Sequence, residues 1–469
     1  MKQLTGLDAS FLNIETGPVY GHTSSVAIYD SANAYEQLTA PRLRERMMSR
    51  IHLVPVFRRK LVTVPMDLDQ PYWCDDPDFD IKAHIYDVGI TAPGSRDQLK
   101  ELVSRIVAKP LDRTRPLWEI AVVNGLEDGT TAIISTVHHS LIDGGSSNDI
   151  NSVLLDRDPD AARSNPEPQP WTPEPTPDPM TLLTSAMTAN ALRPLKAAKL
   201  QWDVISELMQ KSPNIAALAP SMTSSAVTGT AHNTVFNAKP TNRRIWEPFR
   251  VPLSEVKEIR KATGATVNDV VMAICAGGLR SWMLANDCLP DKPLTASVPV
   301  SIRDDSKKGA LGNQVSMIVA ELPTDVDDPL QRLKTVNDAM KSAKEMHDAL
   351  PMAQMIEFGD FATPGMTSMV ARASQRTSMA GQVMPSVTIS NVPGPQWAMY
   401  LCGAKLLENY PVSMIVDGQV LNITLLSYNG DLDFGIVSCP TAVPDLKGVA
   451  DAILADHQVL LEAARRQNG

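Results

Sequence analysis

The chain has 469 residues, of which 43% are hydrophobic, and it carries a formal net charge of −10 with a pI near 5.4. This length predicts two or more domains with large buried cores, and the acidic balance argues against a general nucleic-acid binder, which needs an excess of Lys and Arg. Five scattered cysteines without a Cys-x-x-Cys argue against a disulfide framework or a structural zinc site and fit a reducing cytoplasm.

The N-terminal region mixes helix and strand patterns and ends in an expected hairpin. Its first residues, MKQLTGLDASFLNIETGPVY, lack the uninterrupted apolar stretch of a secretory signal. Two apolar runs, 118–123 and 130–137, flank the turn-rich sequence NGLEDG. The second strand is therefore expected to deliver His138 and His139 to its end.

A proline-rich segment follows. Eight of the 36 prolines lie within 159–179, which argues against regular helix and predicts an extended, semi-rigid linker. Residues 180–225 have apolar positions at helical spacing, so this part is expected to be helical.

Helix and strand patterns alternate again after residue 240. A helix is expected from Leu253, with Ser254 as its N-cap and Gly264 near its end, and the apolar helix VNDVVMAICAGGLRSWML should follow. Strands are expected at 294–303, 314–322 and 386–392, and a hairpin at 419–439 with its turn at Asn429-Gly430. The longest apolar stretch, 270–279, is far shorter than the roughly 20 residues of a membrane span.

These patterns predict an α+β fold in three parts. We expect an N-terminal domain at 1–158, a Pro-rich linker and helical connector at 159–240, and a C-terminal domain at 241–469.

Residues 138–144 read HHSLIDG and suggest proton transfer. Successive side chains on a strand point to opposite faces, so the two histidines are not expected to face one metal ion. A single histidine facing a cavity can accept a proton and return it, because it titrates near pH 6.5. Asp143 could orient this imidazole or pair with an arginine, and Gly144 permits tight backbone geometry. The alternative is a strand-end turn with a buried, satisfied histidine.

The complete His-His-x-x-x-Asp-Gly pattern is a signature of acyltransferases related to chloramphenicol acetyltransferase and peptide-synthetase condensation domains. Five further segments add to it: LTGLDASFLNIET, RPLWEIAVVNGL, TVNDVVMAICAGGLR, VPVSIR and SNVPGP. Together they resemble the bacterial wax ester synthase/diacylglycerol acyltransferase family, from residue 4 to about 460.

The resemblance implies two chloramphenicol acetyltransferase-like domains around a central tunnel. It implies transfer of a fatty acyl group from acyl-CoA, as substrate, to diacylglycerol or a long-chain alcohol, which forms triacylglycerol or wax esters without a cofactor. Attack would be direct, with no acyl-enzyme, and the sequence has no Gly-x-Ser-x-Gly nucleophile elbow.

The resemblance also assigns roles to residues. His139 would be the general base, His138 would support it, and Asp143 would brace the loop through an ion pair with Arg303 near the site. Asn268 would donate a hydrogen bond to the oxyanion, or would instead cap a helix.

Further positions are expected to line the substrate site. Trp118 could equally be a core tryptophan. No residue is expected to bind a metal ion. The substrate-binding positions implied by the resemblance are Glu15, Trp118, Gly144, Arg303, Ser390 and Asn391.

Long-chain substrates imply peripheral contact with the inner face of the membrane or with lipid inclusions, from the cytoplasm. The helical stretch 180–211 is the candidate contact, and the alternative is an amphipathic helix packed between the two domains. Two other functions stay open: a condensation-type or other lipid acyltransferase with a carrier-bound acyl donor, and a non-catalytic lipid-binding protein of the same fold.

Overall fold

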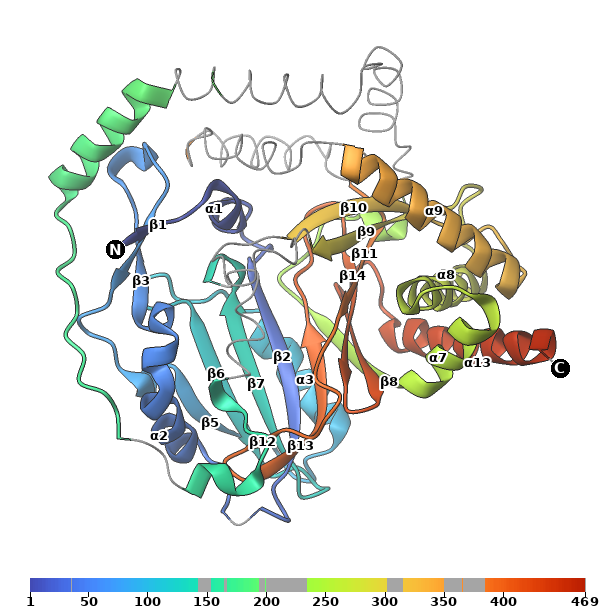
Figure 1. Cartoon of the computed structure of the whole chain (residues 1–469), viewed down its shortest axis with the longest axis horizontal. Helices are drawn as coiled ribbons and strands as arrows, with labels where there is room; N and C mark the ends of the chain where they lie inside the picture. The colour runs from blue at the N-terminus through green and yellow to red at the C-terminus, as the bar shows by residue number, and fades with distance from the viewer. Residues whose placement is uncertain are drawn as a thin grey trace.

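The computed structural model describes residues 1–34, 36–141, 153–163, 167–193, 199, 234–301, 315–349, 365 and 384–468. Within these residues the strands form two six-stranded sheets and one three-stranded sheet, and helices pack beside them (Figure 1). The expected α+β architecture of two halves is confirmed.

The N-terminal sheet has the strand order β12-β13-β2-β7-β6-β5. Its strands are antiparallel except for the parallel pair of β5 and β6. The small sheet has the order β1-β4-β3. The elements of this half are β1 (Lys2–Gln3), α1 (Gly6–Asn13), β2 (His22–Asp30), α2 (Ala40–Arg50), η1 (Ile51–Leu53), η2 (Pro55–Arg58), β3 (Arg59–Val62), η3 (Pro65–Asp67), β4 (Tyr72–Asp75), η4 (Ile81–Ala83), β5 (Ile85–Gly89), α3 (Arg96–Val107), β6 (Trp118–Asn124), β7 (Thr131–His138), η5 (His139–Leu141) and η6 (Pro159–Arg163).

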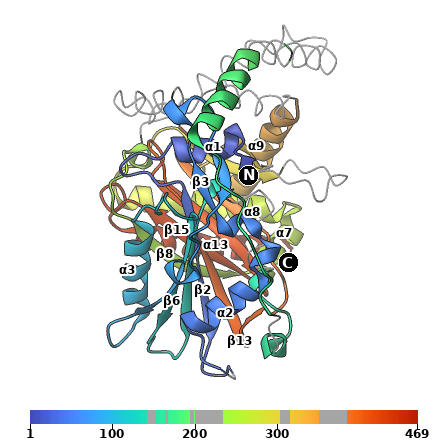
Figure 2. The same cartoon turned by 90° about the vertical axis from the view of Figure 1, so that its left-hand side faces the viewer.

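Alternating apolar side chains bury both faces of this sheet. Ile133 of β7 packs in one cluster with Leu43 of α2, whereas Ile134 packs in another cluster with Leu99 and Val103 of α3. Neighbouring strand residues point to opposite faces, so α2 and α3 lie on opposite sides of the sheet, as Figure 2 shows. This two-sided burial fixes the register of β7 and therefore the place where its last residue emerges.

The C-terminal sheet has the order β10-β9-β11-β14-β15-β8, with β11 parallel to both of its neighbours. Its main core lies against α8, which is buried along most of its length and packs against α7, α9 and α13. The elements of this half are η7 (Val235–Asn237), β8 (Ile245–Pro252), α7 (Leu253–Thr263), α8 (Val267–Ala285), β9 (Leu294–Ser301), β10 (Val315–Leu322), α9 (Pro329–Ala349), β11 (Val387–Val392), β12 (Tyr400–Leu401), β13 (Ala404–Val412), β14 (Leu421–Tyr428), β15 (Asp431–Ser438) and α13 (Leu446–Asn468).

The C-terminal part of the chain contributes two strands to the N-terminal sheet. Strand β13 pairs with β2 along almost its whole length before the chain returns to the C-terminal sheet as β14. The sequence patterns did not indicate this exchange. The division into 1–158, 159–240 and 241–469 stays a prediction. Strands β12 and β13, from the third part, lie in the sheet of the first part.

The two halves also meet through α3 and β8. Nζ of Lys100 lies 3.1 Å from both carboxylate oxygens of Glu247, and Nη2 of Arg250 donates to the carbonyl oxygen of Leu407 at 2.9 Å. A cleft lies between these elements. Its lining comprises Ile28, Arg96, Asp97, Leu99, Lys100, Trp246, Glu247, Pro248, Glu408 and Tyr410. The expected central tunnel stays a prediction.

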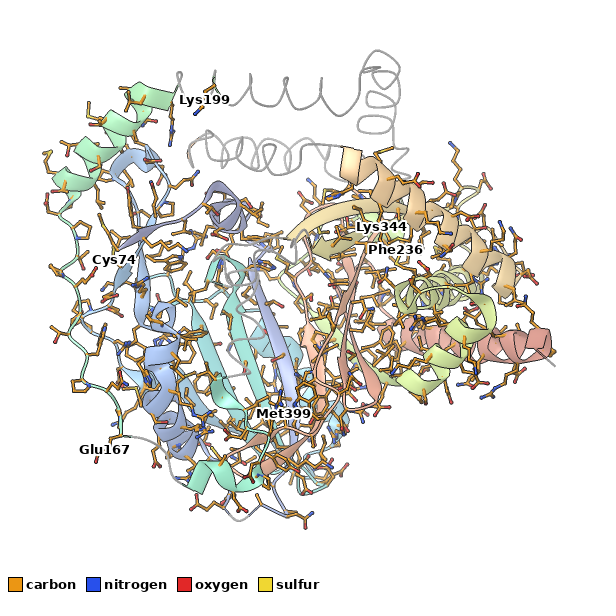
Figure 3. All side chains as sticks on the ribbon, in the orientation of Figure 1. Cys74, Glu167, Lys199, Phe236, Lys344 and Met399 are labelled. Carbon is orange, nitrogen blue, oxygen red and sulfur yellow. The ribbon has the colours of Figure 1, made fainter. Side chains whose placement is uncertain are left out.

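The proline-rich segment runs along the outside of the N-terminal half. Residues 167–178 have no regular secondary structure, pass β3 and β4 (Figure 1), and begin at Glu167, which Figure 3 labels. The guanidinium of Arg58 stacks 4.3 Å from the Trp171 ring centre, and Glu174 pairs with the Met1 amino group at 2.7 Å. The extended segment is thus anchored to the domain, although η6 puts a short 3₁₀ helix at its start.

Most expected elements of the second half are confirmed, with one correction. Asn429 and Gly430 both have positive φ, as the hairpin turn requires, and Gly264 ends α7 in the left-handed region. Ser254 is not the N-cap of α7, because the helix begins one residue earlier and Pro252 occupies that position without a side-chain cap.

Among the described residues, no single helix is long and apolar enough to span a membrane, and only the sharply bent pair α7 and α8 passes that test together.

Candidate active site at the end of strand β7

The two histidines lie where β7 ends. The main-chain N–H of His138 donates to the carbonyl of Leu117 at 2.9 Å, and that of His139 donates to the carbonyl of Gly21 at 2.8 Å. His138 is the last residue of the strand and His139 is the first of η5. The predicted delivery of both residues to the strand end is confirmed, and their rings contact different neighbours.

The ring of His138 is completely engaged. Its Nδ1 accepts the Ser140 main-chain N–H at 3.1 Å and lies 2.6 Å from the Ser140 hydroxyl. A nitrogen that accepts carries no proton in neutral imidazole, so the proton resides on Nε2. Nε2 is 3.2 Å from Oε1 of Glu15 and donates to it. His138 therefore has no free nitrogen for a substrate, which agrees with a supporting role.

Glu15 sits at the centre of this network. Oε1 also accepts the Gly21 N–H at 2.8 Å, and Oε2 accepts from Nε and Nη2 of Arg113 at 3.2 and 2.5 Å. Burial of the carboxylate raises its pKa, but the hydrogen bonds that His138, Gly21 and Arg113 donate outweigh burial and lower the pKa of Glu15 to about 2. Glu15 is thus ionised at any physiological pH and occupied by protein donors.

Gly21 is required by the closeness of its neighbours. A Cβ at this position would lie 2.7 Å from Nε2 of His138 and would also overlap the carbonyl oxygen of Phe11. Only glycine allows α1, β2 and the His138 ring to approach one another this closely.

His139 differs from His138 because no side chain among the described residues bonds its Nδ1. Its ring stacks on Phe11 of α1, with ring centres 3.9 Å apart and planes 20° apart. Nδ1 is buried without a well-formed hydrogen bond to any described residue. Burial, and then the proximity of His138, lower the pKa of His139 to about 4, while contact with its own backbone partly opposes them. The ring is neutral near pH 7 and can accept a proton.

Asn268 is the second residue of α8 and is half-buried. The structure contradicts its alternative role as a helix cap. Thr266 is the N-cap, and its side chain and that of Asp269 form a reciprocal capping box. In the described part of the chain the Asn268 side chain makes no hydrogen bond, and no recorded contact joins it to the histidines.

Trp118 lies in the core. Its side chain is 2% exposed, its ring stacks on His84 with centres 4.5 Å apart, and Nε1 donates to the carbonyl of Phe57 at 2.9 Å. These contacts support the core interpretation of the PLW segment. A substrate contact by Trp118 stays a prediction.

Ser390 and Asn391 lie near the end of β11 and are half-buried. Among the described residues, no hydrogen bond of either side chain is recorded. Asp143, Gly144 and Arg303 lie outside the described residues, and their predicted roles stay predictions.

Four residues of the network were not predicted: Phe11, Gly21, Arg113 and Ser140. Phe11 lies within LTGLDASFLNIET, Arg113 lies two residues before RPLWEIAVVNGL, and Ser140 is the third residue of HHSLIDG. The motifs therefore pointed to these regions but not to the contacts. The partners of Phe11 and Arg113 could not be predicted because these contacts join residues far apart along the chain, such as Arg113 and Glu15. Within the described residues, no group of three or more His, Cys, Asp or Glu side chains could hold a metal ion.

Comparison with known proteins agrees with this site. The model of the wax ester synthase/diacylglycerol acyltransferase catalytic domain matches residues 4–271, and that of the C-terminal domain of the same proteins matches residues 311–458. A Mycobacterium tuberculosis protein whose name describes a diacylglycerol O-acyltransferase is 32% identical over 468 residues, which cover 100% of this chain and 91% of that protein.

Solved structures give the same result. The wax ester synthase/diacylglycerol acyltransferase from Marinobacter aquaeolei VT8 superposes with a TM-score of 0.67 at 27% identity, covering 99% of this chain and all of that chain. The first condensation domain of the calcium-dependent antibiotic synthetase, at 14% identity and a TM-score of 0.60, covers 98% of this chain and 96% of its own and shares the fold.

The fold and the histidine pair at the end of β7 define an acyltransferase built from two linked halves. The chain belongs to the wax ester synthase/diacylglycerol acyltransferase family.

Proposed function

We propose that the protein transfers a fatty acyl group from acyl-CoA to the hydroxyl of diacylglycerol or a long-chain alcohol, forming triacylglycerol or wax ester. The observation that carries this proposal is His139, a buried neutral imidazole whose Nδ1 has no partner among the described residues, at the strand end of an acyltransferase of this family.

His139 acts as the general base. It takes the proton of the acceptor hydroxyl while that oxygen attacks the thioester carbonyl, and the carbonyl becomes a tetrahedral oxyanion. When the intermediate collapses, the carbon–sulfur bond breaks and the leaving thiolate of CoA takes up the proton that His139 received from the hydroxyl. The low pKa of the buried ring favours this transfer, because its protonated form is more acidic than an ordinary imidazolium.

The remaining predicted residues support these steps. Asn268, whose amide has no partner among the described residues, donates a hydrogen bond to the oxyanion. Ser390, Asn391 and Gly144 line the substrate site. Asp143 and Arg303 pair and hold the loop after His139.

Glu15 serves the site through His138 and Gly21. Because protein donors occupy both of its carboxylate oxygens, it positions these residues and leaves substrate contact to others.

The test is an acyl-transfer assay with palmitoyl-CoA and either dipalmitoylglycerol or hexadecanol. His139→Ala should lower kcat by about 100- to 10,000-fold, the usual contribution of a general base. His52→Ala is the matched control, because His52 is a half-buried histidine of η1 outside the network. Equal turnover by wild type and His139→Ala would contradict the role of His139. Binding of palmitoyl-CoA without transfer to either acceptor would favour the lipid-binding alternative.

We also propose that the outer face of helix 179–193 contacts a membrane or lipid-inclusion surface. Leu182 and Ala186 are buried against the protein, whereas Met180 and Met187 are 65% and 60% exposed. Met66 of the adjoining η3 is 76% exposed. Apolar side chains on the outside of an anchored helix can enter the interface between headgroups and acyl chains.

The described part of this helix is not packed between the two halves. Figure 1 shows it at the outer edge of the N-terminal half. Nδ2 of Asn190 donates to the carbonyl of Leu68 at 2.9 Å, and Arg193 pairs with Asp69 at 2.5 Å. These bonds hold the helix at that edge and favour the surface role over the packing alternative.

Liposome flotation tests this contact. Met187→Glu should reduce the bound fraction several-fold on vesicles that contain phosphatidylglycerol and diacylglycerol. Met346→Glu is the matched control, because Met346 is a 51% exposed methionine of α9. An unchanged bound fraction for Met187→Glu would argue against this face.

A further inference from the structure

We propose that Arg113 is a positioning residue of the active site, which holds two groups that contact His139: the carbonyl of Gly21 and the ring of Phe11. The inference rests on the proposed role of His139 as the base.

Arg113 joins Glu15 to the end of α1. Its Nε and Nη2 bind Oε2 of Glu15, and Nη2 also donates to the carbonyl of Leu12 at 2.9 Å. The last carbonyls of a helix lack partners within the helix, and a cation there also complements the helix dipole. Arg113 thereby fixes the C-terminal turn of α1 relative to Glu15.

Two paths lead from this pair to His139. In the first, Glu15 binds the N–H of Gly21 at 2.8 Å, and the carbonyl of Gly21 binds the N–H of His139, also at 2.8 Å. In the second, Arg113 holds the carbonyl of Leu12, whose neighbour Phe11 stacks on the His139 ring. One path fixes the backbone of His139 and the other fixes the plane of its imidazole.

The exposure of Arg113 separates positioning from stability. Its side chain is 46% exposed, whereas that of Glu15 is 14% exposed. A half-exposed ion pair adds little to folding stability. Replacement of Arg113 should therefore change the geometry at His139 without unfolding the protein.

The electrostatic role points the same way. After His138 and Gly21, the hydrogen bond from Arg113 also helps to keep the pKa of Glu15 low. Without Arg113 the Glu15 carboxylate loses a charge-assisted hydrogen bond, which raises its pKa. Glu15 therefore takes up a proton at a higher pH than in the wild type. Activity of an Arg113 variant should then decline more strongly toward acid pH than that of the wild type.

The test compares Arg113→Met, Arg113→Lys and Arg115→Met. Arg115 is the matched control, because it lies two residues away, is 38% exposed and donates to the carbonyl of Ala83. Arg113→Met should lower kcat by about 10- to 100-fold, as expected when a catalytic group is displaced by about 1 Å. The KM for palmitoyl-CoA should stay within about threefold of the wild-type value, because the change acts on geometry rather than uniform binding.

Arg113→Lys should recover part of the activity. A lysine ammonium can pair with Glu15, but it lacks the planar fork that reaches Glu15 and the Leu12 carbonyl together. Glu15→Gln combined with Arg113→Met should cost little more than the more damaging single change, because residues in one network are not additive.

A second measurement does not depend on turnover. In protein with ¹⁵N-labelled histidine, the ring signals of His139 can be assigned by their loss in His139→Ala. Arg113→Met should shift these signals and Arg115→Met should leave them in place. Unshifted signals together with a kcat within about twofold of wild type would overturn the proposal. Shifted signals in a protein whose wild type transfers no acyl group would uphold the positioning role and refute the proposed function.

Discussion

Gly21→Ala tests how closely the active site is packed. The added Cβ would lie 2.7 Å from Nε2 and 3.1 Å from Cε1 of His138, and it would overlap the main-chain oxygen of Phe11. Real Cβ atoms essentially never approach another heavy atom within 3.0 Å, so the His138 ring or the end of α1 must move. Either movement disturbs a group that holds His139.

The size of the effect follows from these overlaps. Forcing a methyl group into a filled site costs about 1–3 kcal/mol of unfolding free energy. This is smaller than the roughly 5–15 kcal/mol by which folded proteins are usually stable, so the variant should remain folded. Displacement of a reacting group by about 1 Å can lower the rate by about 100-fold, so we expect kcat to fall by about 10- to 100-fold.

The assay measures kcat with palmitoyl-CoA and dipalmitoylglycerol, together with the urea unfolding midpoint. Gly17→Ala is the matched control, because a Cβ on Gly17 would meet no atom within 4 Å. Its stability should stay within about 0.5 kcal/mol of wild type. If Gly21→Ala keeps both the turnover and the stability of the wild type, the inferred close packing of α1, Gly21 and His138 is refuted.

Three further predictions concern single residues. His139 must be neutral to accept a proton, and its pKa is about 4, so the acid limb of kcat/KM should lie near pH 4; a limb near pH 6.5 would show an unperturbed base. Trp118→Phe leaves the Phe57 carbonyl without its partner and should cost about 1–3 kcal/mol with KM nearly unchanged, whereas a several-fold rise in KM would indicate substrate contact. Burial raises the pKa of Asp433 to about 6 from 3.8, although Arg250 opposes it, so the native state holds a proton between these values that the unfolded state has lost. The stability of wild type relative to Asp433→Asn should thus fall as pH rises from 4 to 6 and then stay level, and urea midpoints that differ equally at pH 4 and 7 would contradict this.

The sequence predicted the elements whose signals are local. The hairpin of β14 and β15 follows from Asn429-Gly430 between apolar runs, and both residues have the positive φ that such a turn needs. The placement of His138 and His139 at the end of β7 follows from the preceding hairpin pattern in the same way. Each of these predictions used fewer than about 25 neighbouring residues.

Local signals failed where two interpretations share the same residues. Ser254 resembles an N-cap in sequence, yet α7 begins at Leu253 and Pro252 occupies the N-cap position without a side-chain cap. Asn268 also resembles a cap, but Thr266 and Asp269 cap each other first. The correct choice depended on one or two residues of register, which sequence patterns do not determine.

The motif LDFGI at 432–436 shows the same limit over longer distances. Asp433 accepts from Nε of Arg250 at 2.7 Å and from the N–H of Asn409 at 2.8 Å, and a Cβ on Gly435 would overlap the carbonyl oxygen of Pro411. Arg250 belongs to β8, whereas Asn409 and Pro411 belong to β13 of the other sheet. The aspartate at 433 and the glycine at 435 are therefore explained by contacts between the two sheets. Neighbouring residues in the sequence do not indicate these contacts.

This crossing matters for the site because its predicted residues come from both halves. His139 follows β7 of the N-terminal sheet, whereas Ser390 lies on β11 of the C-terminal sheet. Strand β13 pairs with β2, the neighbour of β7, and Asp433 ties β13 to β8 and β15. The contacts of Asp433 thus help to place the proposed base and the predicted substrate-lining residues relative to each other. The sequence could name the residues of each half, but their mutual placement depends on contacts such as that between Asn409 and Asp433.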